Sequence, residues 1–126
     1  MIDIKSLRIG NIIKDHKGNL REVAYITECL GLKNDIGGID KYQKEPIISF
    51  DIETLDFAEL IEELLLKCGA INKFGRTYFI GKIKFDINTL NIVRFHYSGK
   101  VAYIYYLHQL QNLWYSLYNE ELQINL

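Results

Sequence analysis

Residues 56–68 carry the most regular pattern in the chain, and this pattern constrains the fold most. Apolar residues recur there at the three- and four-residue spacing that gives a helix one buried face. They are Phe57, Leu60, Ile61, Leu64, Leu65 and Cys68. Asp56 and Glu59 have the spacing of a capping box, and Gly69 suits the position after the last helical residue. The pattern predicts a helix over 56–68 that packs on one side.

Short runs of β-branched and aromatic residues, separated by turn residues, surround this helix. The expected strands are 9–15, 20–29, 46–52, 77–80, 82–87, 91–97 and 100–103. A polar, glycine-containing turn joins the first two, and the last four form an antiparallel meander. Residues 30–45 are expected to be a long connection, with a short strand at 38–40. We therefore predict an α+β fold, in which a bent antiparallel sheet packs against two amphipathic helices, as a single domain over 1–126.

The second expected helix, over 104–118, has an unusual polar side. Its apolar stripe consists of Leu107, Leu110, Trp114 and Leu117. The opposite side carries Tyr105, His108, Gln109, Asn112 and Ser116. A helix side that faces water usually carries Lys and Glu, whereas neutral amides, an imidazole and a phenol cost less to desolvate and form directional hydrogen bonds. We expect this side to meet a partner, a second copy or a polar ligand; the alternative is that it bonds to strands of its own domain.

Charge and cysteine usage exclude several classes of partner. The net charge is −1, from 15 basic and 16 acidic residues. Polymeric nucleic acid is not expected, because proteins that bind it draw much of their affinity from an excess of positive charge. No apolar run approaches the ~20 residues that span a bilayer, so no membrane contact is expected. Cys29 and Cys68 lie in apolar patterns without a CxxC motif, which predicts buried free thiols and a cytosolic location.

The motifs that carry chemistry do not occur. His16, His96 and His108 have no metal-ligand spacing, and neither GxxxxGK[ST] nor GxGxxG is present. The first helix carries three acidic residues off its apolar stripe, namely Glu59, Glu62 and Glu63. They are interpreted as a solvated face rather than as an acid–base pair. We expect no catalytic residue, no metal and no cofactor, and therefore no enzyme.

Basic and aromatic residues alternate in the second half of the chain. The basic residues are Lys67, Lys73, Arg76, Lys82, Lys84, Arg94 and Lys100, and the aromatic ones are Phe74, Tyr78, Phe79, Phe85, Phe95 and Tyr97. A sheet face with both kinds would suit an anionic, ring-bearing ligand such as a nucleotide. The alternative is an amphipathic meander, apolar inside and lysine-rich outside. Arg94 and Lys100 join Tyr105, His108, Gln109 and Asn112 as candidate ligand-binding residues.

Short segments spread over nearly the whole chain carry a resemblance. They are Leu7-Arg8-Ile9-Gly10-Asn11, Leu64-Leu65-Leu66-Lys67-Cys68-Gly69, Thr77-Tyr78-Phe79, His108-Gln109-Leu110-Gln111-Asn112-Leu113 and Glu120-Glu121-Leu122. Their order resembles a family of small phage and prophage proteins of Bacteroidetes bacteria, and the fourth segment is the most specific. Members often have Thr-Gly where Tyr118-Asn119 stands here. The family has no assigned activity, so the resemblance implies provenance: an accessory phage protein.

Three functions are expected from these observations. The first is a phage-encoded, non-enzymatic binding protein that sequesters a small nucleotide-like immune signal of the host, an anti-defence sponge that works as a homo-oligomer. The second is a protein–protein module that inhibits a host factor. The third is a small virion or assembly component. A pocket with cationic and aromatic walls would favour the first, an exposed apolar patch the second, and a repeating interface the third.

Overall fold

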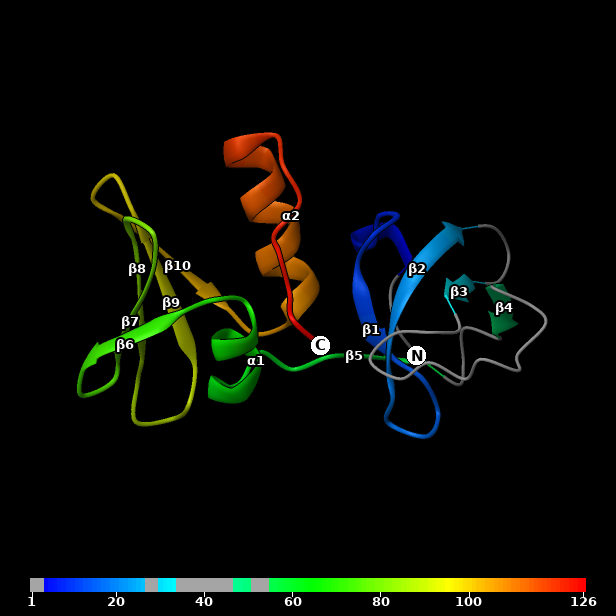
Figure 1. Ribbon diagram of the computed structural model, residues 1–126, viewed down its shortest axis with the longest axis horizontal. Coiled ribbons are helices and arrows are strands. Elements are labelled where there is room, and N and C mark those ends of the chain that lie inside the picture. Colours follow the sequence, from blue (N-terminus) through cyan, green and yellow to red (C-terminus); the bar gives the residue numbers. More distant parts are fainter. Residues whose placement is uncertain (1–3, 27–29, 34–46, 51–54) are drawn as a thin grey trace. The chain divides into compact units, whose positions relative to one another are not determined.

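The computed structural model describes residues 4–26, 30–33, 47–50 and 55–126 (Figure 1). The chain divides into two compact units, Met1–Ala58 and Glu59–Leu126. Each unit is built around its own antiparallel sheet. The prediction of a mixed α+β fold is confirmed, but two sheets take the place of the single bent sheet. The single domain over 1–126 stays a prediction.

The first unit contains a five-stranded sheet with the order β4-β3-β2-β1-β5. Its elements are η1 (Ile4–Ser6), β1 (Ile12–Lys14), β2 (Leu20–Ile26), β3 (Leu30–Lys33), β4 (Ile47–Phe50) and β5 (Asp56–Phe57). The core of this unit consists of Leu7, Ile13, Val23, Leu30, Leu32 and Leu55. The predicted β1–β2 hairpin is present. The expected strand at 38–40 lies outside the described residues.

The side chain of Asp15 organises the β1–β2 turn. Its Oδ1 atom accepts hydrogen bonds from the backbone N–H groups of Lys17 and Asn19, each at 2.9 Å. Its Oδ2 atom accepts from Nε of Arg21 at 2.7 Å. Gly18 supplies the positive φ of the turn, at 80°. A local carboxylate therefore fixes the hairpin that the sequence pattern predicts.

The second unit contains a five-stranded meander with the order β10-β9-β8-β7-β6. Its strands are β6 (Ile71–Phe74), β7 (Thr77–Ile80), β8 (Ile83–Ile87), β9 (Val93–Tyr97) and β10 (Lys100–Ile104). Its helices are α1 (Glu62–Lys67) and α2 (Leu107–Tyr118). The predicted meander over 77–103 is confirmed, and β6 is an additional strand that the pattern did not predict. Figure 1 shows that α1 and α2 lie on the same side of this sheet.

The first helix is much shorter than predicted, because its expected start forms strand pairs instead. Asp56 lies in β5 and pairs with Lys14, so it does not cap a helix. The backbone N–H of Leu60 donates to the carbonyl of Tyr105 at 2.9 Å. The helix begins only at Glu62. Gly69, with a φ of 88°, does follow the helix end as predicted.

Candidate functional site

Three aromatic residues of the second sheet lie on its core face, and two others share the opposite face with basic residues. Tyr78, Phe85 and Phe95 are buried on one face. The rings of Phe85 and Phe95 meet edge to face, with centroids 5.3 Å apart. Lys84 and Arg94 occupy alternate positions along the same strands and point to the other face. These three rings build the core, whereas Phe79 lies opposite Lys84 and Tyr103 opposite Arg94, so the other face carries both aromatic and basic residues.

Arg94 is tied to a neighbouring carboxylate. It lies directly opposite Asp86 on β8, and its Nε atom is 2.5 Å from Oδ1 of Asp86. Oδ2 of the same carboxylate is 2.6 Å from Nε2 of His96. Burial of Asp86 opposes its ionisation, but the contacts with Arg94 and His96 outweigh it and lower its pKa. The guanidinium of Arg94 is therefore already compensated, which makes it a poor anchor for a phosphate.

The polar side predicted for the second helix does not form one surface. His108 is buried, beside Leu107 and Leu110, and burial lowers its pKa to about 4. Its ring stacks on that of Tyr106 at a centroid distance of 5.9 Å. A neutral, buried imidazole belongs to the packed side of α2. His108 is thus buried whereas Gln109 is exposed, and the role of His108 in binding a ligand stays a prediction.

Gln109 closes the first turn of α2. Its Oε1 atom accepts hydrogen bonds from the backbone N–H groups of Tyr105 and Tyr106, at 2.9 and 3.1 Å. The side chain of Tyr105 is exposed, and that of Asn112 is half-buried. Lys100 is exposed at the start of β10, opposite Tyr97. The predicted ligand-binding residues are thus spread over the unit and do not converge.

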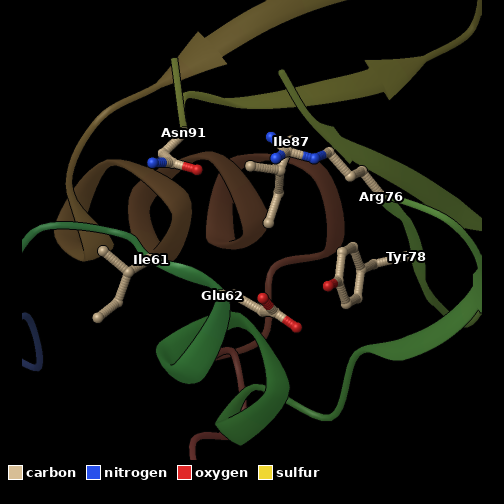
Figure 2. A pocket seen from close by; sticks show the side chains of 6 residues that line it. All are labelled: Ile61, Glu62, Arg76, Tyr78, Ile87 and Asn91. Carbon is tan, nitrogen blue, oxygen red and sulfur yellow. The ribbon is translucent and has the colours of Figure 1, made fainter. Parts of the chain in front are cut away.

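A pocket of about 320 Å³ opens elsewhere in the second unit (Figure 2). Its walls come from the start of α1, the beginning of β7, the end of β8 and the turn after it. They are formed by Ile61, Glu62, Arg76, Tyr78, Ile87 and Asn91. Figure 2 shows the carboxylate of Glu62 across the hollow from the guanidinium of Arg76. No ion pair joins these two groups in the described unit, so opposite charges face the same space.

Hydrogen bonds fix the walls of this pocket. The hydroxyl of Tyr78 bonds to the carboxylate of Glu62, and this bond, helped by burial, raises the pKa of Tyr78. Nη1 of Arg76 donates to the carbonyl of Asn88 at 2.6 Å, and the backbone N–H of Ile87 donates to the carbonyl of Arg76 at 3.0 Å. The charged rim is therefore held in place before any ligand arrives. Such pre-organisation reduces the entropy lost on binding.

Sequence reasoning missed this pocket for a physical reason. Glu62 was interpreted as part of a solvated face, and Arg76 was one of many basic residues. The pairing of Thr77 with Asp86 places Arg76 beside the end of β8, and the hydrogen bond with Tyr78 holds Glu62 of α1 at the same hollow. The alternating strand patterns of 77–80 and 82–87, joined by a tight turn, already contained the signal for that pairing.

A second hollow, of about 520 Å³, lies beside Cys68 and Trp114 and is rimmed by residues 120–123. The thiol of Cys68 is free and buried, as predicted, whereas Cys29 lies outside the described residues. Burial raises the pKa of Cys68 to about 12. A thiol with such a pKa stays protonated and is a poor nucleophile. The thiol of this hollow therefore gives no basis for nucleophilic chemistry.

Within the described ranges, no three His, Cys, Asp or Glu side chains are grouped so that they would hold a metal ion. None of the helices in the described part of the chain has the length and apolar character needed to cross a bilayer. Comparisons with protein-family models, curated proteins and solved structures found no match for this sequence.

Proposed function

We propose that this chain is a non-enzymatic binding protein whose pocket at α1 takes one small, ring-bearing ligand of the nucleotide type. The observation that carries the proposal is the placement of Glu62 and Arg76 on opposite walls of a hollow of about 320 Å³. That volume lies at the small end of the ~300–1,000 Å³ range of ligand pockets. One nucleobase with its sugar and phosphate suits it better than an oligonucleotide.

The chemistry of the walls matches the parts of such a ligand. The carboxylate of Glu62 accepts hydrogen bonds from ring N–H or amino groups, while Ile61 and Ile87 offer apolar contacts to the ring. Arg76 uses Nη1 for the carbonyl of Asn88, and its other N–H groups can donate to a phosphate. A ligand with donors at one end and an anion at the other satisfies both charges.

Binding without turnover is part of this proposal. The hydroxyl of Tyr78 already bonds to Glu62, and its raised pKa keeps the proton on the phenol. The pocket is thus better suited to holding a ligand than to transforming it.

The biological setting in the proposal rests on the sequence resemblance. A phage accessory protein that binds a nucleotide without converting it would act as a sponge for an immune signal in the host cytosol. Two amphipathic helices packed on the sheet of the second unit, and a homo-oligomeric state, belong to the same proposal. Of these parts of the proposal, the chemistry of the pocket supports only the class of ligand.

The test is calorimetric titration of the full chain with purine and pyrimidine mononucleotides and with a cyclic dinucleotide. Glu62→Gln removes the charge and keeps an acceptor near Tyr78, so affinity for a mononucleotide should fall about 10-fold or more, since a charge-assisted hydrogen bond is worth ~1.5–3 kcal/mol. Glu63→Gln is the matched control, because Glu63 is exposed, pairs with Lys67 and does not line the pocket. Equal affinities of the two variants, or no binding by the wild type, would contradict the proposal.

A second candidate, a protein–protein module, is favoured by the open face of the same sheet. Ile71, Phe74, Val101 and Tyr103 are each more than half exposed there. Apolar side chains gathered on an exposed surface mark interaction sites in many proteins. Affinity capture of host proteins with wild type and with an Ile71→Glu, Phe74→Glu double variant tests this candidate. A partner retained equally by both proteins would argue against this face.

A further inference from the structure

We propose that the free edge of β10 pairs with the same edge of a second copy of this chain. This inference does not rest on the pocket, which β10 does not line. It rests on three properties of Lys100–Ile104: the direction of its backbone groups, the regularity of its pairing, and the symmetry of its side-chain pattern.

The hairpin between β9 and β10 fixes which backbone groups point outward. Ser98 and Gly99 have φ values of 50° and 78°, as a two-residue turn of type I′ requires. The flanking residues of such a turn form a hydrogen-bonded pair, and bonded and non-bonded pairs then alternate. Lys100, Ala102 and Ile104 therefore direct their N–H and C=O groups towards β9. The corresponding groups of Val101 and Tyr103 point away from the sheet.

The next outward group along this edge confirms that direction. The carbonyl of Tyr105 accepts a hydrogen bond from the N–H of Leu60 at 2.9 Å. The outward carbonyl of Tyr105 thus has a partner within its own unit. The outward N–H and C=O groups of Val101 and Tyr103 have no such partner within the described unit. Unpaired N–H and C=O groups on an exposed edge are a template for another strand.

The two edges of this sheet differ in regularity. β10 pairs with β9 over all five residues without a shift in register. β6, at the opposite edge, has a shifted register between Asn72 and Phe74. Such a bulge discourages strand addition. β10 is therefore the edge of this sheet that favours association.

A two-fold axis at Ala102 makes β10 complementary to itself. Val101 of one copy then lies opposite Tyr103 of the other, and the pair exchanges both backbone hydrogen bonds. An aromatic side chain beside a β-branched one is a favourable cross-strand pair. The axis also sets Lys100 opposite Ile104, so the two lysines stand about 14 Å apart at ~3.4 Å per residue, beyond the Debye length of ~10 Å at 0.1 M salt. Arg94, on the neighbouring strand, is neutralised by Asp86.

The experiment is sedimentation of the full chain over a range of concentrations, for wild type and two variants. Val101→Pro removes an outward N–H that has no partner inside the unit, and an edge strand tolerates proline at such a position. It should weaken dimer formation by about 10-fold or more, because two hydrogen bonds are lost per dimer. Val101→Thr keeps the N–H and strand propensity, so it should still form dimers.

Amide hydrogen exchange of the wild type gives an independent readout if the proline variant unfolds. The N–H groups of Val101 and Tyr103 should be protected at high protein concentration and exchange faster on dilution, while the N–H of Ala102 stays protected throughout. A monomer at about 1 mM protein, or equal dimerisation of Val101→Pro and wild type, would overturn the proposal. Loss of dimer in Val101→Thr but not in Val101→Pro would also overturn it, since packing of the face would then drive association.

Discussion

Replacing Asp15 with asparagine should destabilise the first unit in a way that depends on pH. The side chain of Asp15 is 1% exposed and holds both the turn N–H groups and the guanidinium of Arg21. Asparagine can keep the contacts to Lys17 and Asn19, but its amide cannot compensate the charge of Arg21, which is itself only 17% exposed. The loss of one charge-assisted bond predicts a decrease of about 2–3 kcal/mol in the free energy of unfolding at pH 7.

The pH dependence follows from the pKa of Asp15. Burial opposes ionisation, but the bonds from Arg21 and the turn N–H groups outweigh it, so the folded-state pKa of Asp15 lies below its ordinary value. The unfolded chain therefore binds more protons in the window between the two pKa values. The contribution of Asp15 is complete above the unfolded pKa, and it is lost as the pH falls through the folded one. The difference in stability between wild type and variant should therefore be smaller at pH ~2 than at pH 7, because pH 2 lies below the ordinary pKa of a carboxylate.

Urea unfolding at pH 7 and at pH 2, followed by circular dichroism, measures both effects. Asp56→Asn is the control within the same unit, because Asp56 is exposed and its carboxylate accepts only from the N–H of Phe57. That variant should change stability by less than about 0.5 kcal/mol, as most surface substitutions do. A difference for Asp15→Asn that is as large at pH 2 as at pH 7 would refute the electrostatic explanation.

Three further predictions concern the second unit. His108 should titrate near pH 4 by NMR, and because the unfolded chain binds more protons between pH ~4 and ~6.5, stability should fall as the pH drops through that window; a value near 6.5 would contradict its burial. Cys68 should react with a thiol reagent at pH 8 only after urea is added, and rapid labelling of the folded chain would show that its pKa is not raised. Gln109→Ala should lower the free energy of unfolding by about 1 kcal/mol, because the hydrogen bonds from Tyr105 and Tyr106 are lost, and it should leave sedimentation unchanged. A change in sedimentation would show that Gln109 contributes to an interface between copies.

The sequence predicts those parts of the fold that local chemistry determines. The β1–β2 and β9–β10 hairpins follow from turn residues next to alternating strands, and the second helix follows from its apolar stripe. The first helix was overextended because residues 56–60 have a helical spacing of apolar residues but bond elsewhere. Asp56 pairs with Lys14, and Leu60 with Tyr105. Both pairings join residues more than forty positions apart, and no local pattern encodes them.

The candidate site was predicted less well, because residue type alone does not show whether a charge is compensated. Arg94 and Arg76 both lie in the basic stretch that pointed to an anionic ligand. The β8–β9 register sets Arg94 opposite Asp86, and their ion pair is internal. Register could in principle have been derived from the strand pattern, but a shift of one residue reverses every side chain.

Arg76 differs from Arg94 in where the meander places it. It precedes β7, where the β8 residue bonded to it is Ile87 and not an acidic residue, and its Nη1 donates to a neutral carbonyl. A hydrogen bond of this kind orients the guanidinium without neutralising it. The carboxylate of Glu62 is held in a similar way, by the hydroxyl of Tyr78. Two oriented and uncompensated charges across one hollow favour a ligand that carries both a donor edge and an anion, and this is why the proposed ligand site moves from Arg94 and α2 to the pocket at α1.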